Sequence, residues 1–205
     1  MRRFVPLALA ATMAMGNFAF TSAATGEPII TDTVGDANGF TGQGIVLGAG
    51  DNAGPGSQDW ADLTHFSVIP DKRKSELRLG VGSLSSTNNV IFRIMTTIDD
   101  CAVWFQITSE DSTVVGSTRL TADCGSSVAG VYTDGVTVDL DEDTSEYVMT
   151  LNFSKLDSNV KPYVKSGKEG VGLELSSRLI AATPAASATV PQMDDAFDED
   201  VSFKL

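Results

Sequence analysis

The sequence predicts an all-β protein: an antiparallel β-sandwich, in a jelly-roll or immunoglobulin-like arrangement, with one disulfide. Three observations support this fold class. Apolar and polar residues alternate over several short segments, turn-forming residues separate those segments, and two cysteines occur in a chain whose start is typical of an exported protein. Alternation turns one face of each strand towards a core, and many short strands separated by turns are typical of a sandwich.

The alternating segments cover most of the chain after residue 66. The segments predicted as strands are residues 77–81, 92–98, 101–107, 113–120, 136–140, 147–153, 171–175 and 201–205. Before them, a stretch rich in Gly, Asp and Asn from Thr31 to Asp59 is predicted as loop, with one short strand at Gly44–Leu47. No segment of helical period is long enough to rival the strands.

The most specific prediction is a central hairpin that turns at Asp99 and Asp100. This turn would place Ile98 opposite Cys101, and it sorts both strands into an apolar face and a mixed face. The mixed face would carry Arg93, Met95, Trp104 and Gln106.

Residues 1–24 predict a secretory signal peptide. Arg2 and Arg3 precede an apolar run, and small residues follow it, which places cleavage after Ala23 or Ala24. The alternative is that the apolar run is a membrane anchor. The expected location is therefore secreted and extracellular in a bacterium, with the periplasm as the alternative, and no membrane association is expected after cleavage.

Residues 25–205 are predicted as a single sandwich domain. Within it, residues 181–194 are predicted as an extended strap that crosses before the last strand, because Thr183–Pro191 is rich in Ala, Pro, Ser and Thr.

Cys101 and Cys124 are the only cysteines. In an oxidising compartment an isolated pair of cysteines most often forms a disulfide, so these two are predicted to be bonded. The alternative is two free buried thiols.

The formal net charge of the chain is −13, and loss of Arg2 and Arg3 with the signal peptide makes it more negative. A strongly negative field repels phosphate backbones and anionic lipid surfaces, so nucleic acid is not expected as a partner.

Acidic and amide side chains with glycine in Asp32–Gly39 suggest a calcium site. Calcium takes about six to eight oxygen ligands and tolerates irregular loops. The candidate ligands are Asp32, Asp36, Asn38, Asp59, Asp62, Asp194 and Asp195, which would converge if the two ends of the domain pack together. The alternative is that Asp, Asn and Gly simply form turns there.

The same stretch carries a family resemblance. Asp32-Thr33-Val34-Gly35-Asp36-Ala37 resembles the "DxxGDA" start of small secreted bacterial β-sandwich modules, and Asp59-Trp60-Ala61-Asp62-Leu63 continues the match. Such modules are similar to carbohydrate-binding and DOMON-like domains. The resemblance implies a sandwich fold and a binding role. By analogy with DOMON-like haem domains, it also raises His65 with Met95 or Met149 as a conceivable ligand pair.

Trp104 is the candidate for sugar binding. A flat aromatic ring beside Arg93, Gln106 and Met95 could stack on a pyranose while polar neighbours form hydrogen bonds. The alternative is that another segment covers Trp104.

The sequence therefore predicts an exported, non-catalytic binding or accessory module. Calcium is its expected cofactor, and carbohydrate, envelope material or an extracellular protein its expected partner. The alternative is a structural or protein-interaction domain without a small ligand. A third possibility is a glycoside hydrolase, which would need paired carboxylates from the acidic runs Asp139–Asp143 or Asp194–Asp200.

Overall fold

The computed structural model describes residues 26–32, 40–41, 44–45, 61–84, 90–110, 112–179 and 192–205. The predicted signal peptide lies outside the described residues, as do Asp36, Asn38 and Asp59 and most of the predicted strap. Within the described ranges, no helix has the length and apolar character of a membrane span.

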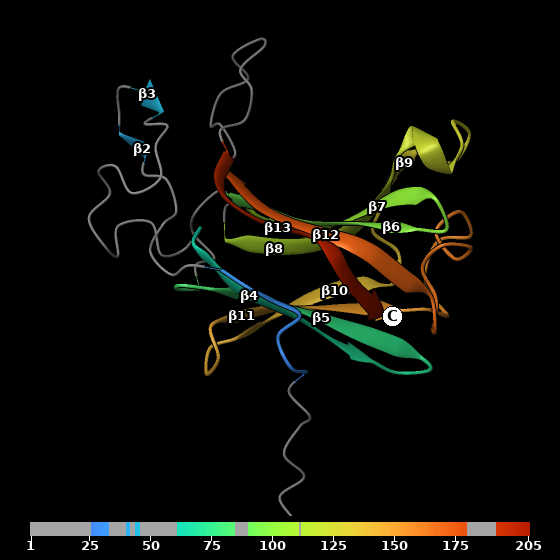
Figure 1. Ribbon diagram of the computed structural model, residues 1–205, viewed down its shortest axis with the longest axis horizontal. Coiled ribbons are helices and arrows are strands. Elements are labelled where there is room, and N and C mark those ends of the chain that lie inside the picture. The colour runs from blue at the N-terminus through green and yellow to red at the C-terminus, as the bar shows by residue number, and fades with distance from the viewer. Residues whose placement is uncertain are drawn as a thin grey trace, which may run out of the picture.

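The described chain folds into two packed antiparallel sheets, so the predicted β-sandwich is confirmed (Figure 1). One sheet has five strands in the order β1-β4-β5-β11-β10, and the other has six in the order β13-β12-β6-β7-β8-β9. A separate two-stranded ribbon pairs β2 with β3. The finer choice between a jelly-roll and an immunoglobulin-like arrangement stays a prediction.

Most predicted strands are present, with small shifts at their ends. In chain order the strands are β1 (Ile30–Thr31), β2 (Phe40–Thr41), β3 (Gly44–Ile45), β4 (Leu63–Pro70), β5 (Lys74–Val81), β6 (Val90–Ile98), β7 (Cys101–Glu110), β8 (Thr113–Leu120), β9 (Gly130–Tyr132), β10 (Val136–Asp141), β11 (Glu146–Asn152), β12 (Glu169–Leu179) and β13 (Gln192–Lys204). One short 3₁₀ turn, Ala122–Cys124, precedes β9.

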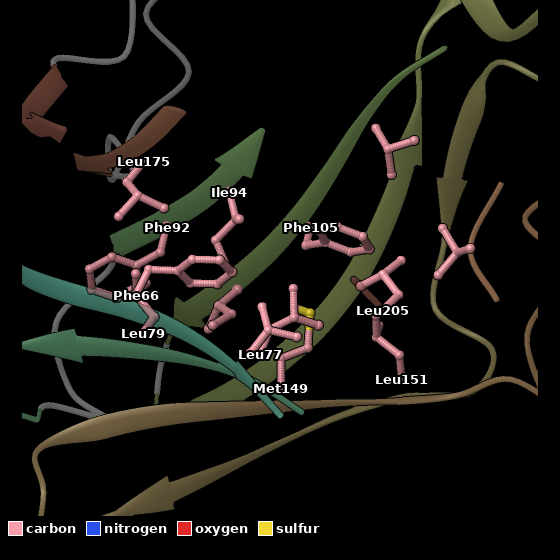
Figure 2. Close-up of a cluster of buried hydrophobic side chains, with 14 of the residues drawn as sticks. Phe66, Leu77, Leu79, Phe92, Ile94, Phe105, Met149, Leu151, Leu175 and Leu205 are labelled. Atoms are coloured by element: carbon pink, nitrogen blue, oxygen red, sulfur yellow. The ribbon is translucent and has the colours of Figure 1, made fainter. Parts of the chain in front are cut away.

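The core lies between the two sheets, where the alternating apolar side chains of both layers meet (Figure 2). Phe92 and Phe105 of the six-stranded sheet are fully buried, as are Leu77 and Met149 of the five-stranded sheet. Full burial of a side chain of this size stabilises the fold by about 1.5–3 kcal/mol. Removal of apolar surface from water is therefore the main force that holds the two layers together.

At β8 the layers approach closely because Gly116 has no side chain. A Cβ atom on Gly116 would lie 2.7 Å from a methyl group of Val136 and 2.8 Å from one of Val138, both on β10. Glycine is thus needed here for the close approach of β10 to β8.

The predicted central hairpin is confirmed residue by residue. Ile98 pairs with Cys101, and Met95 pairs with Trp104. Asp99 and Asp100 both have positive φ, at 50° and 62°. Two consecutive left-handed residues are the signature of the tight hairpin turn whose twist matches the flanking strands.

The predicted disulfide is also confirmed: Cys101 is bonded to Cys124, 23 positions further along the chain. It ties the start of β7 to the 3₁₀ turn that follows β8. Because Cys101 lies beside the Asp99-Asp100 turn, the bond anchors the same end of the central hairpin.

The last strand was predicted too short. β13 begins at Gln192, so residues 192–194 belong to a strand and not to the strap, and the acidic run Asp194–Asp200 lies within that strand. Pairing with β12 accounts for this, because residues 192–198 pair with positions 173–178 and satisfy their backbone groups there. Acidic residues in a strand at the edge of a sheet also protect it against pairing with other chains.

We expect the disulfide to stabilise the fold by about 3 kcal/mol, because cross-linking restricts the unfolded chain. Replacing Cys101 and Cys124 together by Ser should lower the free energy of unfolding by about that amount, measured by urea titration. A reductant should destabilise the natural protein and leave the double variant unchanged. Equal unfolding curves for both proteins would contradict this.

Candidate functional site

The outer face of the six-stranded sheet carries the strongest candidate site. β6, β7 and β8 lie side by side, and their outward residues form rows across the sheet. One row pairs Met95 with Trp104 and Trp104 with Arg119, and the next pairs Arg93 with Gln106. The four predicted ligand residues, Trp104, Arg93, Gln106 and Met95, therefore lie on one face, as the hairpin register required.

Trp104 is held between two arginines. The guanidinium carbon of Arg93 on β6 lies 5.0 Å from the centre of the indole ring, and that of Arg119 on β8 lies 4.7 Å from it. Both distances lie within the range of cation–π attraction. The two arginines come from β6 and β8, which lie on either side of β7, so the indole ring is contacted by a side chain from each neighbouring strand.

Positive charge is concentrated here although the protein is acidic. Burial lowers the pKa of Arg93, and the positive charges of Arg178 and Arg119 lower it further. An arginine stays charged in proteins, so this lowered pKa reflects burial and the neighbouring positive charges and not loss of charge. None of the ion pairs between described residues involves Arg93 or Arg119.

Several hydrogen-bonding atoms at this cluster are buried without a hydrogen-bond partner in the described part of the chain. They are Nε of Arg93, Nε1 of Trp104 and Oγ of Ser176, whose residue is 1% exposed and pairs with Arg93 across the sheet. A buried polar group without a partner costs about 1–3 kcal/mol. Donors of this kind would gain the most free energy from a hydrogen bond to a negatively charged acceptor.

We name Arg93, Trp104, Gln106, Arg119 and Ser176 the arginine–tryptophan cluster. Sequence reasoning missed Arg119 and Ser176. Arg119 could have been found by pairing the predicted strand 113–120 with 101–107. Ser176 could not, because its position depends on the pairing of β12 with β6, which are distant in the sequence.

A second constellation lies on the outer face of the five-stranded sheet and centres on Glu146. Its carboxylate accepts hydrogen bonds from Nε2 of His65 at 2.8 Å, from Arg78 at 2.8 Å and from the hydroxyl of Thr144 at 2.8 Å. The hydroxyl of Thr64 lies 3.0 Å from the other ring nitrogen of His65. Every polar atom of this carboxylate is thus engaged within the protein.

The pKa of Glu146 reflects two opposing effects. Burial alone would raise it, but the hydrogen bonds from His65, Thr144 and Arg78 outweigh burial and hold it below its ordinary value of 4.5. A general acid in glycoside hydrolysis uses a raised pKa instead. Glu146 is therefore arranged to stay ionised and to hold neighbouring strands together.

The suggested haem ligands do not come together. His65 lies on the outer face of the five-stranded sheet, where it bonds Glu146. Met149 is fully buried in the core, and Met95 lies on the outer face of the opposite sheet. The alternation of strand residues thus places the three side chains on different sides of the two layers.

The acidic run Asp139–Asp143 borders a hollow of about 590 Å³ on the same outer face. Glu76, which also lines it, bonds Lys74 at 2.9 Å, and Asp141 bonds Arg78 at 3.3 Å. The hydrogen bond from Lys74 contributes most to holding the pKa of Glu76 below its ordinary value, against the effect of burial. Two of the carboxylates in this hollow therefore form ion pairs.

The predicted calcium ligands are only partly described. The backbone N–H of Asp32 donates to Thr64 at 2.9 Å, and Asp62 lies just before β4. The hydroxyl of Ser177 donates to the carbonyl of Ala61 at 2.7 Å, and Ser177 pairs with Asp194. Asp32, Asp62 and the backbone of Asp194 are therefore at one end of the sandwich. No cluster of three or more potential metal ligands occurs among the described residues.

No protein-family model matches the chain, and no curated protein matches it. The resemblance to carbohydrate-binding and DOMON-like modules stays a prediction.

The Glu146 cluster should make the stability of the protein sensitive to acid. The pKa of Glu146 is lowered in the folded state, so ionised Glu146 stabilises the fold above about pH 4.5. This stabilisation is lost as the pH falls through the pKa that Glu146 has in the folded protein. Glu146→Gln should cost about 1–3 kcal/mol at neutral pH and little at acid pH, measured by urea titration from pH 7 to pH 3.

Glu142→Gln is the matched control, because Glu142 is exposed in the adjoining turn. It should behave like the natural protein across this pH range. If the free energy of unfolding changed with pH in the same way for the natural protein and for Glu146→Gln, the role assigned to Glu146 would be contradicted.

Proposed function

We propose that the protein is an exported, non-catalytic binding module, and that the outer face of its six-stranded sheet binds an acidic carbohydrate of the envelope or of the extracellular space. The observation that supports this most directly is the arginine–tryptophan cluster, in which Arg93 and Arg119 flank Trp104.

The chemistry of the cluster favours an acidic sugar over a neutral one. An indole ring that already contacts guanidinium groups offers little free surface for stacking on a pyranose. The guanidinium groups themselves match the geometry of a carboxylate or sulfate, which they can bind through two parallel hydrogen bonds. Gln106, which is partly exposed, adds a neutral hydrogen-bonding group for sugar hydroxyls.

The overall negative charge does not prevent such binding. At physiological ionic strength the screening length is about 8 Å, so an anion at the cluster interacts mainly with the charges nearest to it. Arg119 and Arg178 lie close enough to Arg93 for their charges to act on it, so three positive charges are gathered at this part of the face.

We also propose that calcium stabilises the end of the sandwich where Asp32 and Asp62 lie. Support comes from the hydrogen bonds Asp32–Thr64 and Ser177–Ala61 and from the pairing of Ser177 with Asp194, which bring the segment before β4 and the start of β13 to that end. The other predicted ligands are Asp194 and Asp195, together with Asp36, Asn38 and Asp59 outside the described residues, and they would supply the rest of the oxygen shell that calcium requires.

Replacing Trp104 by Ala or Arg93 by Gln should weaken binding to polygalacturonate about tenfold, the loss expected for one charge-assisted contact. Calorimetric titration of the purified protein with polygalacturonate, and with dextran as the neutral polymer, measures this. Arg73→Gln is the matched control, because Arg73 is exposed in the turn between β4 and β5. It should bind like the natural protein.

Two results would contradict the proposal. One is equal binding of polygalacturonate and dextran, and the other is unchanged binding by both cluster variants at unchanged melting temperature. If the protein bound neither polymer, this result would favour the alternative of a protein-interaction domain without a small ligand.

Calcium at millimolar concentration should raise the melting temperature by several degrees over the chelated protein, because a ligand that binds only the folded state stabilises it. Asp62→Asn should reduce this rise, and Asp157→Asn, in a loop distant from β4 in the sequence, should not. Identical melting curves with calcium and with chelator would exclude a calcium site.

A further inference from the structure

A groove of about 580 Å³ lies on the same outer face, at the end of the sheet where β6 turns into β7. Its apolar lining consists of Met95, Ala102, Val171, Leu173 and Phe197. Its acidic lining consists of Asp99, Asp100, Glu174 and Glu199. Met95 also pairs with Trp104, so the groove begins beside the arginine–tryptophan cluster and extends away from it.

The pairing of β12 is irregular at this groove, with one extra residue on β12 opposite β6 and two extra residues on β13 opposite β12. The pairing of β12 shifts register between Val171 and Leu173 on the β13 side, and between Val171 and Glu174 on the β6 side. Gly172 within the bulge has a φ of +68°, a left-handed conformation that glycine adopts without strain. On either side of the bulge, Val171 lies opposite Thr97 and Glu174 lies opposite Met95. Val171 and Glu174 are therefore neighbours on the outer face of the sheet.

The apolar lining is unusually exposed. Phe197 is 59% exposed and Val171 is 55% exposed, among the largest exposures of hydrophobic side chains in the described residues. A single exposed apolar residue needs no explanation, but exposed apolar residues that share a groove with a polar rim are typical of an interaction site.

Three of the four acidic residues at the rim form no ion pair with a described residue. Asp99 forms an ion pair with Lys168. Asp100, Glu174 and Glu199 form no ion pair with any described residue. By contrast, the acidic side chains Glu76, Asp141 and Glu146 of the other sheet are bonded to Arg78.

We propose that this groove binds an extended segment of another protein in which an apolar side chain is flanked by lysine or arginine. The apolar side chain would lie against Phe197 and Val171, and the flanking cations would meet Glu174 and Glu199. Charge complementarity selects this occupant, because the carboxylates of Asp100, Glu174 and Glu199 at the rim attract a cationic segment and repel the same rim of a second copy. The proposal is independent of the binding of acidic carbohydrate.

The test uses a fluorescein-labelled hexapeptide in which leucine alternates with lysine, titrated with the whole purified protein and followed by fluorescence anisotropy. The natural protein should bind this peptide. It should bind more weakly a peptide with serine in place of leucine, and not bind one with glutamate in place of lysine. The double variant Glu174→Lys, Glu199→Lys should lose about tenfold or more in affinity, and Phe197→Ser should also weaken binding.

The matched control is the double variant Glu142→Lys, Asp143→Lys. It makes the same change of net charge on exposed residues of the β10–β11 turn, in the opposite sheet. It should change affinity less than about twofold, because at moderate ionic strength distant exposed charges are screened. Melting temperatures of all variants establish that each is folded.

Three results would overturn the proposal. The first is an equal loss in both charge-reversal variants, which would mean that net charge alone attracts the peptide. The second is no saturation below about 1 mM peptide. The third is a concentration-dependent increase in mass in sedimentation that Phe197→Ser abolishes, which would mean that a second copy occupies the groove.

Discussion

The structure depends above all on the register of the central hairpin, β6 and β7. The left-handed pair Asp99 and Asp100 sets it, and the disulfide from Cys101 anchors the same end. With this register Phe92 and Phe105 point into the core, while Arg93 and Trp104 point outwards. A slip by one residue would exchange the two faces, so that the core and the candidate site would be lost together.

The outer faces of the two sheets use charge in different ways. On the five-stranded sheet, Arg78 bonds Glu146, Glu76 and Asp141, so these opposite charges compensate each other, whereas Asp139, Glu142 and Asp143 form no ion pair with any described residue. On the six-stranded sheet, positive charge gathers around Trp104, and negative charge gathers at the groove beyond Met95. Compensated charges stabilise a fold, whereas separated charges of one sign are available to a partner. On the six-stranded sheet these charges lie beside Trp104 and Phe197, which is the physical reason for proposing a binding role there.

That sheet therefore offers two adjoining surfaces of opposite charge. The arginine–tryptophan cluster combines buried donors with guanidinium groups, which suits an anion. The groove combines an exposed phenylalanine with carboxylates, which suits a cation attached to an apolar group. Since Met95 borders both, the occupants of the two surfaces would be neighbours on one face of the protein.

The sequence by itself determined the fold class, the central hairpin with its register, the disulfide and the four outward residues around Trp104. These features are local: period-two alternation assigns faces, and a two-residue turn pairs adjacent strands. Only the tertiary structure decided the full length of β13, the contribution of Ser176 and the groove at Gly172. Each of these depends on β12, and no local pattern in the sequence encodes its pairing with β6 and β13. The groove depends also on a bulge, and alternation alone cannot assign which residues of a bulge point outwards.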